Sequence, residues 1–107
     1  MSELVYKIAP RNEWEAAVRE GVYRGSKDDA RDGFIHLSSQ PQISGVLLRH
    51  FAGQQDLLLI SLRVEDLGEA LVFEKSFNGE RFPHLYGELN PRLAIEVREI
   101  ETSSTPI

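Results

Sequence analysis

The sequence predicts a single small α+β domain with two principal helices and about five or six short strands. Residues 57–62 form an apolar run with too little alternation for a half-exposed strand, which is typical of a central strand buried on both faces. Apolar residues recur at helical spacing between positions 43 and 51. Residues 94–98 alternate between apolar and polar side chains, as expected of a closing strand.

The first elements follow from short local signals. Residues 4–8 read as a strand that Pro10 ends. Asn12 and Glu15 have capping-box spacing, which predicts a helix of about two to three turns. Gly21 is a natural stop for that helix.

The middle of the chain repeats this order of helix and strand. Ser26 could begin a short helical turn, and residues 34–37 read as the next strand. Ser39 is the expected N-cap of the second principal helix, with Pro41 in its first turn and Gly53 at its end.

The C-terminal part is expected to consist of short strands joined by turns. Residues 67–71 predict a single turn, residues 72–74 a short strand, and Asn78-Gly79 a tight turn. We therefore expect one domain over residues 1–100 and a flexible Ser/Thr/Pro-rich tail over residues 101–107.

Composition restricts the classes of function. A length of 107 residues gives room for one domain, and the net charge of −5 with dispersed basic residues argues against a nucleic-acid partner. Neither a secretory signal nor an apolar run of about 20 residues occurs, so we expect a cytoplasmic protein without a membrane segment. Cysteine is absent, which excludes disulfides and thiolate chemistry.

Two segments place a histidine between an aromatic residue and a hydroxyl residue. Successive side chains of an extended chain point to opposite faces. One face of the first segment therefore carries Phe34, His36 and Ser38. One face of the second segment carries Phe82, His84 and Tyr86. This recurrence predicts the lining of a pocket.

Pro83 limits where the second segment can lie. Proline cannot donate to a sheet ladder, so we expect an edge strand or an extended loop with a sharp exit at Gly87. In the functional interpretation, His84 and Tyr86 are pocket donors and Arg81 binds an anion. The alternative is a structural edge in which Tyr86 packs and His84 is solvated.

Several further side chains have competing interpretations. His36 could be an interior histidine bonded to backbone, and a phosphate could lie near Ser38 at the start of the second helix. His50 is expected at the surface or the core boundary. Glu74 could act as a base or ribose acceptor, although a surface salt bridge is the simpler interpretation. The three histidines lack metal-ligand spacing, so no metal is expected.

These motifs together resemble a family of small bacterial proteins, the domain-of-unknown-function family 952. The resemblance covers nearly the whole chain up to about residue 100 and rests on Tyr6-Lys7-Ile8, Trp14, Gly21-Val22-Tyr23, Asp32-Gly33-Phe34-Ile35-His36-Leu37-Ser38 and Phe82-Pro83-His84-Leu85-Tyr86-Gly87.

That family is similar to a minimal ADP-ribosyltransferase fold, and more distantly to tRNA 2′-phosphotransferases. The resemblance implies a split antiparallel or mixed sheet with NAD bound in a central cleft. Where the phosphotransferases have a Tyr-His-Gly-Thr strand, this chain has Lys7 for the histidine and Ile8-Ala9 for Gly-Thr.

The resemblance implies a ligand and a set of site residues. The ligand would be NAD or another ADP-ribose-containing nucleotide, and any reaction would be transfer or hydrolysis of the ADP-ribosyl group. The implied catalytic residues are His36, His84 and Tyr86, and the implied nucleotide contacts are Lys7, Ser38, Arg81 and Gly87. His36 would hydrogen-bond ribose or pyrophosphate. The alternative is a non-catalytic binding or interaction module on the same fold.

Overall fold

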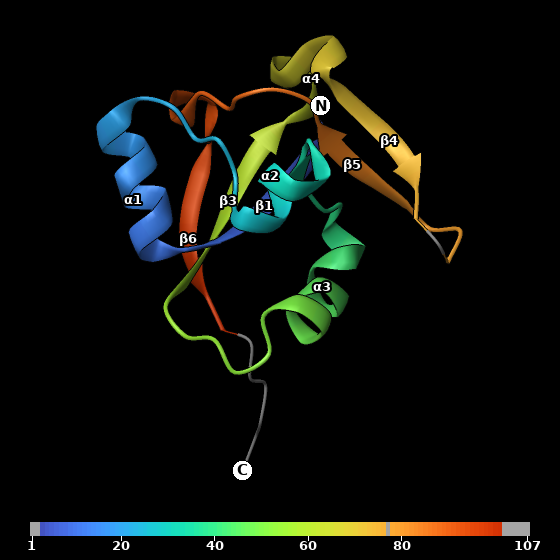
Figure 1. The fold of residues 1–107 in the computed structure, drawn as a ribbon, viewed down its shortest axis with the longest axis horizontal. Helices are drawn as coiled ribbons and strands as arrows, with labels where there is room; N and C mark the ends of the chain where they lie inside the picture. The colour runs from blue at the N-terminus through green and yellow to red at the C-terminus, as the bar shows by residue number, and fades with distance from the viewer. Residues whose placement is uncertain (1–2, 77, 102–107) are drawn as a thin grey trace.

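The strands of the computed structural model, which describes residues 3–76 and 78–101, form two three-stranded antiparallel sheets (Figure 1). The first sheet has the order β1 (Leu4–Pro10), β3 (Leu57–Arg63), β6 (Glu96–Ile100). The second has the order β2 (Ile35–His36), β5 (Arg81–Leu85), β4 (Leu71–Lys75). Residues 102–107 of the expected tail lie outside the described residues.

The helices are short and lie around these sheets. They are α1 (Arg11–Glu20), α2 (Lys27–Asp32), α3 (Ile43–His50) and α4 (Val64–Leu67), with 3₁₀ turns at η1 (Gln40–Gln42), η2 (Gly68–Ala70) and η3 (Pro91–Leu93). In Figure 1, α1 lies beside the first sheet, the β4–β5 hairpin projects on the other side, and α2 lies between them. The α+β class is confirmed. In the described part of the chain, no helix has the length and apolarity that a membrane span needs.

The central strand β3 is the core of the first sheet, as its apolar run predicts. Its residues 57–62 are all buried, and it pairs with β1 on one side and β6 on the other. Ile60 and its neighbours on one face pack with Trp14 of α1. Leu57 and Leu59 on the other face pack with Leu47 of α3. Each principal helix therefore covers one face of the same sheet.

The predicted stripe on the second principal helix is also confirmed. Leu47 is buried, while Ile43, Val46 and Phe51 pack partly buried against the same cluster. The last bond of the helical ladder is donated by the Phe51 N–H to the Leu47 carbonyl at 3.0 Å, so α3 ends at His50, before the expected Gly53.

Backbone hydrogen bonds join the two sheets. The Tyr6 and Ser38 main chains exchange two N–H···O bonds of 2.8 Å each, which link β1 to the segment after β2. Gln42 adds a side-chain link, because its Nε2 donates to the Arg81 carbonyl at 2.7 Å. These contacts hold β5 and β2 against the first sheet.

The predicted capping box at Asn12 and Glu15 is wrong. The helix begins at Arg11, directly after β1, with Pro10 as its N-cap and, within the described residues, no side-chain cap. The Arg11 N–H donates instead to the Asp56 carbonyl at 2.9 Å. A backbone group from the loop before β3 therefore takes the place that the cap would fill.

The expectation that Pro83 lies in an edge strand or loop is also wrong, because β5 is the middle strand of its sheet. The Leu37 N–H donates to the Pro83 carbonyl at 3.0 Å. An antiparallel hydrogen-bonded pair normally returns a second bond, which proline cannot donate. The paired ladder of β2 accordingly ends at His36, opposite His84. Gly87 has φ of 124° and makes the expected exit after β5.

We predict that Ile60→Ala lowers the unfolding free energy by roughly 2–5 kcal/mol, because it leaves a cavity in the middle of β3. Ile60 is 0% exposed, whereas Ile95 is 40% exposed and provides the matched control. Urea unfolding of both variants checks this. Equal losses for Ile60→Ala and Ile95→Ala would contradict the assignment of β3 as the core strand.

Candidate functional site

A cavity of about 340 Å³ lies where α2, α3 and the second sheet meet. Four of the predicted site residues line it, namely Lys7, His36, Ser38 and His84. Phe34 and Phe82 also line it, which confirms the common face inferred from alternation in the two histidine segments. The cavity therefore brings together residues of both histidine segments.

His84 is oriented by a carboxylate on the neighbouring strand. Glu74 of β4 pairs with Phe82 and so lies diagonally across from His84 on one face of the sheet. His84 Nδ1 lies 2.7 Å from Glu74 Oε1, and the Tyr86 hydroxyl donates to the same oxygen at 2.7 Å. The hydrogen bonds from His84 and Tyr86 lower the pKa of Glu74, and the bond to Glu74 raises the pKa of Tyr86. Glu74 is thus an ionised acceptor for both side chains.

Stacking fixes the plane of the His84 ring. The Phe34 and His84 ring centroids are 3.9 Å apart with an interplanar angle of 22°. The Phe34 centroid also lies 4.6 Å from His36 and 5.3 Å from Tyr86. Phe34 is therefore the centre of an aromatic cluster that joins the two histidine segments.

His36 has carboxylates at both ring nitrogens. Its Nδ1 lies 2.6 Å from Asp29 Oδ1, and its Nε2 lies 3.0 Å from Asp32 Oδ2. Its main-chain N–H also donates to Asp29 Oδ1 at 3.1 Å. His36 lines the cavity as expected, but these contacts leave neither ring nitrogen for the hydrogen bond to a ligand that the resemblance implies.

Asp29 is a buried carboxylate with donors on both oxygens. Oδ2 accepts from Lys7 Nζ at 2.8 Å and from the Ser26 N–H at 2.9 Å, while Oδ1 accepts from His36. Burial favours the neutral acid, but the hydrogen bond from His36 and the charge and hydrogen bond of Lys7 outweigh it. The pKa of Asp29 consequently lies well below its usual range.

Lys7, an implied nucleotide contact, is bound to groups of the protein itself. The side chain is 5% exposed, and its ammonium group donates to Asp29 and to the His36 carbonyl at 3.2 Å. Its charge is therefore already compensated inside the protein. Lys7 also lines the cavity, as part of the network of hydrogen bonds that holds His36.

Gly25 is required where the chain passes Asp29. It has φ of 100°, and a Cβ placed there would lie 2.6 Å from Asp29 Cβ and 2.7 Å from its Oδ2. Any side chain would displace the carboxylate that binds Lys7 and His36. The glycine is thus part of the site's support.

The remaining predicted site residues lie apart from the cavity wall. Arg81 has an exposed side chain, and neither it nor Tyr86 nor Gly87 is among the described residues that line the cavity. Tyr86 still contacts the site through Glu74 and Phe34. Arg81 therefore lies outside this cavity, and its anion contact stays a prediction.

Sequence reasoning missed Asp29 and Asp32, and it placed His50 at the surface or the core boundary without a role in the cavity. His50 is exposed but also lines the cavity. The available signal for Asp29 was Lys7, which shares a strand face with the buried residues Val5 and Ala9 and so requires a counter-charge. The spacing of Ser26 and Asp29 gives a capping box, which the structure forms.

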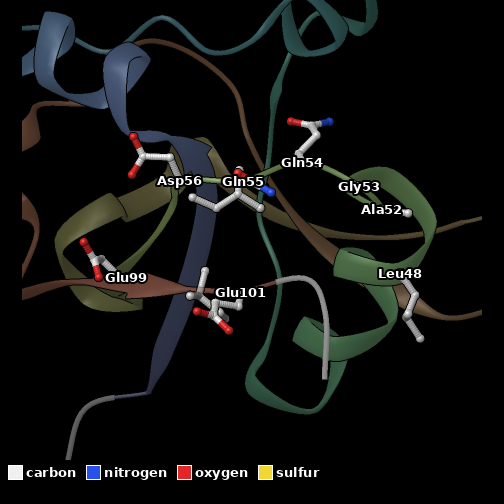
Figure 2. A pocket seen from close by; sticks show the side chains of 10 residues that line it. Leu48, Ala52, Gly53, Gln54, Gln55, Asp56, Glu99 and Glu101 are labelled. Atoms are coloured by element: carbon white, nitrogen blue, oxygen red, sulfur yellow. The ribbon is translucent and has the colours of Figure 1, made fainter. Parts of the chain in front are cut away.

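A second, larger hollow of about 640 Å³ lies between the loop before β3 and the end of β6 (Figure 2). In Figure 2 its carboxylates, at Asp56, Glu99 and Glu101, spread along the wall and do not converge on one point. Arg11 forms ion pairs with Asp56 and Glu99. Across residues 3–76 and 78–101, no group of three or more His, Asp or Glu is placed to hold a metal ion.

Most of the chain matches one known protein family. The family described as "Protein of unknown function (DUF952)" matches residues 8–97. This chain belongs to the DUF952 family. No curated protein matches it. The likeness of the family to the ADP-ribosyltransferase fold stays a prediction.

Solved structures similar to this DUF952 chain come from protein CC0527 of Caulobacter crescentus. Its crystal structure has a TM-score of 0.90 at 40% identity and covers 94% of this chain and 89% of that chain. A crystal structure of a double mutant gives a TM-score of 0.89 with the same identity and coverage. The solution NMR structure gives 0.83 at 40% identity and covers 94% and 87% of the two chains.

We predict that Gly25→Ala destabilises this DUF952 protein more than Gly53→Ala. Both glycines have positive φ, but the Cβ added at Gly53 meets no described atom within 4 Å. Gly53→Ala should therefore cost only backbone strain of about 1–2 kcal/mol. Gly25→Ala should lose about 1–3 kcal/mol more, because it displaces Asp29. Thermal and urea unfolding measure the difference, and equal losses would contradict the close approach.

We predict a second stability effect at Asp29, this time dependent on pH. A carboxylate whose pKa is depressed by folding stabilises the protein above its unfolded pKa, and this contribution is lost as the pH falls below about 4. Asp29→Asn should lower the unfolding free energy at neutral pH by roughly 3–5 kcal/mol, because Lys7 and His36 lose their partner. Its stability should then fall less than that of the wild type on acidification.

The matched control for Asp29→Asn is Asp28→Asn on the same helix. Asp28 is exposed and pairs with Arg31 at 3.3 Å. That change should alter stability by less than about 1 kcal/mol. Parallel pH profiles for Asp29→Asn and the wild type between pH 2 and 7 would show that Asp29 does not carry the acid response.

Proposed function

We propose that the cavity of about 340 Å³ binds a nucleotide that contains ADP-ribose, with NAD as the first candidate. The observation that supports this most is His84, which lines the cavity with its Nδ1 held by Glu74 and its ring stacked on Phe34. A ribose hydroxyl can donate to the other nitrogen, Nε2. The aromatic walls from Phe34 and Phe82 suit a ring of the ligand.

The charge at the mouth also supports an anionic ligand. Arg49 and His50 line the cavity from the last turn of α3. Within the described part of the chain Arg49 forms no ion pair, whereas Arg31 on the opposite wall pairs with Asp28 and Asp32. Arg49 is thus the basic side chain available to a pyrophosphate.

The cavity volume limits how the ligand is held. A volume of about 340 Å³ lies near the lower end of the roughly 300–1,000 Å³ that small-molecule sites usually have. We therefore expect one half of a dinucleotide to be enclosed and the other half to lie at the mouth near Arg49.

Chemistry at this site would be transfer or hydrolysis at the N-glycosidic carbon of the ADP-ribosyl group. The protein would contribute orientation of the ribose and acceptance of a proton from the attacking hydroxyl or water at His84. A second candidate is a non-catalytic binding module. It is favoured by Asp29 and Asp32, whose carboxylates are bound to His36, Lys7 and Arg31 and so are less available to a developing cation.

We predict that titration with NAD or ADP-ribose shifts the backbone amide NMR signals of Ser38, His84 and Arg49. Nicotinamide and ribose 5-phosphate, titrated separately, show which half is enclosed. His84→Ala should weaken binding about tenfold, the equivalent of one hydrogen bond. Val18→Ala, an exposed change on α1, is the control and should leave the affinity unchanged. Unshifted signals at millimolar nucleotide would remove the proposal.

Release of nicotinamide from NAD separates the enzyme from the binding module. If the site is catalytic, release should be lost in His84→Ala and kept in Val18→Ala. Binding without release in the wild type would favour the module.

A further inference from the structure

We infer that the two histidines of the cavity hold different protonation states and different roles. His36 is a fixed imidazolium that positions α2 against β2, and His84 is the neutral imidazole whose Nε2 exchanges a proton with the ligand. The assignment for His36 stands on the geometry and the charges around its ring and does not depend on the proposed function. The ligand's part in the assignment for His84 rests on the proposed function.

The number of hydrogens on the His36 ring follows from its two neighbours. A neutral imidazole carries one N–H, yet His36 presents Nδ1 to Asp29 at 2.6 Å and Nε2 to Asp32 at 3.0 Å. Both carboxyl groups have a pKa below the usual range, Asp32 chiefly through its hydrogen bond from Arg31, so neither supplies the missing hydrogen. Both nitrogens of His36 must then carry one.

The groups that face the His36 ring favour the same state. Asp29 and Asp32 each lie at one ring nitrogen, while Lys7 pairs with Asp29 and Arg31 pairs with Asp32. A neutral His36 would leave the lone pair of one ring nitrogen facing a carboxylate oxygen, whereas a protonated His36 presents an N–H to each carboxylate. On the other walls, the titratable and charged groups that line the cavity are His84, Arg49 and His50.

His84 has a different environment. Its Nδ1 faces one carboxylate, Glu74, and within residues 3–76 and 78–101 no group hydrogen-bonds to its Nε2. The His84 side chain is largely buried, at 13% exposed against 39% for His36, and the residue lines the cavity. A donor from a ligand would be the partner of Nε2.

The proton transfer is balanced within this arrangement. A ligand O–H gives its proton to His84 Nε2, and the ligand oxygen keeps the electron pair. The imidazolium that forms is stabilised by Glu74 at Nδ1, and the reverse step returns the proton. Tyr86 is a positioning residue, because its hydroxyl donates to the Glu74 oxygen that holds His84.

This division also specifies the chemistry of the ligand. The group that meets His84 must be a hydrogen-bond donor such as a hydroxyl. His36 adds positive charge beside His84, since the two ring centroids are 5.7 Å apart, and its own ring nitrogens already face Asp29 and Asp32. Any direct hydrogen bonds to an anionic group of the ligand therefore come from elsewhere, with Arg49 as the available cation.

The test is imidazole ¹H–¹⁵N NMR of the ligand-free full chain at neutral pH. The chain has three histidines, so His50→Gln and His84→Gln assign every ring. We expect both nitrogens of His36 to resonate as protonated nitrogens. We expect His84 to show a protonated Nδ1 and an unprotonated Nε2, which resonates far downfield. An unprotonated nitrogen in His36, or two protonated ones in His84, would overturn the inference.

Matched variants on α2 test the contact to His36. Asp32→Ala should remove the slowly exchanging Nε2–H signal of His36 and retain its Nδ1–H signal. Asp28→Ala, on the same helix and paired with Arg31, should leave both signals in place. Loss of neither signal in Asp32→Ala would contradict the clamp by two carboxylates.

Addition of NAD distinguishes the two proposals. If NAD binds, the Nε2 resonance of His84 should shift while both nitrogens of His36 keep their positions. Movement of the His36 nitrogens with a static His84 would reverse the assignment. If NAD does not bind, the proposed function fails, while the ligand-free spectra still decide the protonation states.

Discussion

The buried carboxylate of Asp29 is the constraint on which the rest of the molecule depends. It receives hydrogen bonds from β1 through Lys7, from the start of α2 through Ser26, and from β2 through His36. An ionised carboxylate that is 2% exposed is stable only when such partners surround it. One side chain thereby joins the first sheet, the second sheet and the helix between them, and Gly25 leaves it room.

This constraint redistributes the roles of the polar residues. Lys7 and His36 have the residue types of ligand contacts, but in the fold they balance the charge of Asp29. The groups that remain available to a ligand are His84 on β5 and Arg49 on α3. Structural and functional chemistry therefore lie side by side in one cavity, because His36 and His84 are paired across β2 and β5 with ring centroids 5.7 Å apart.

The sequence was informative where a signal is local. The apolar patterns of residues 43–51 and of β3 each lie within a single element. The alternation of side chains along an extended segment likewise placed Phe34 on the face of His36. The Glu74–His84 pair was not predictable, because it depends on the register of β4 against β5. The edge position expected for Pro83 was wrong for a related reason. The residues next to the proline in the sequence carry no information about the length of the strand that pairs with it. The cap expected at Asn12 was replaced by a carbonyl from a distant loop.

The missing N–H of Pro83 has a consequence for how the second sheet assembles during folding. A slip of β5 by one residue would turn His84 into the core and Leu85 into the cavity. A slip by two residues would restore the faces, but it would move the proline to a different partner along β2 or β4. Pro83 cannot donate the second hydrogen bond of an antiparallel pair. A slipped pairing that needs this bond is therefore destabilised, although the polarity of the side chains alone would permit it. A residue that removes a hydrogen bond from the native sheet thus selects among competing sheets.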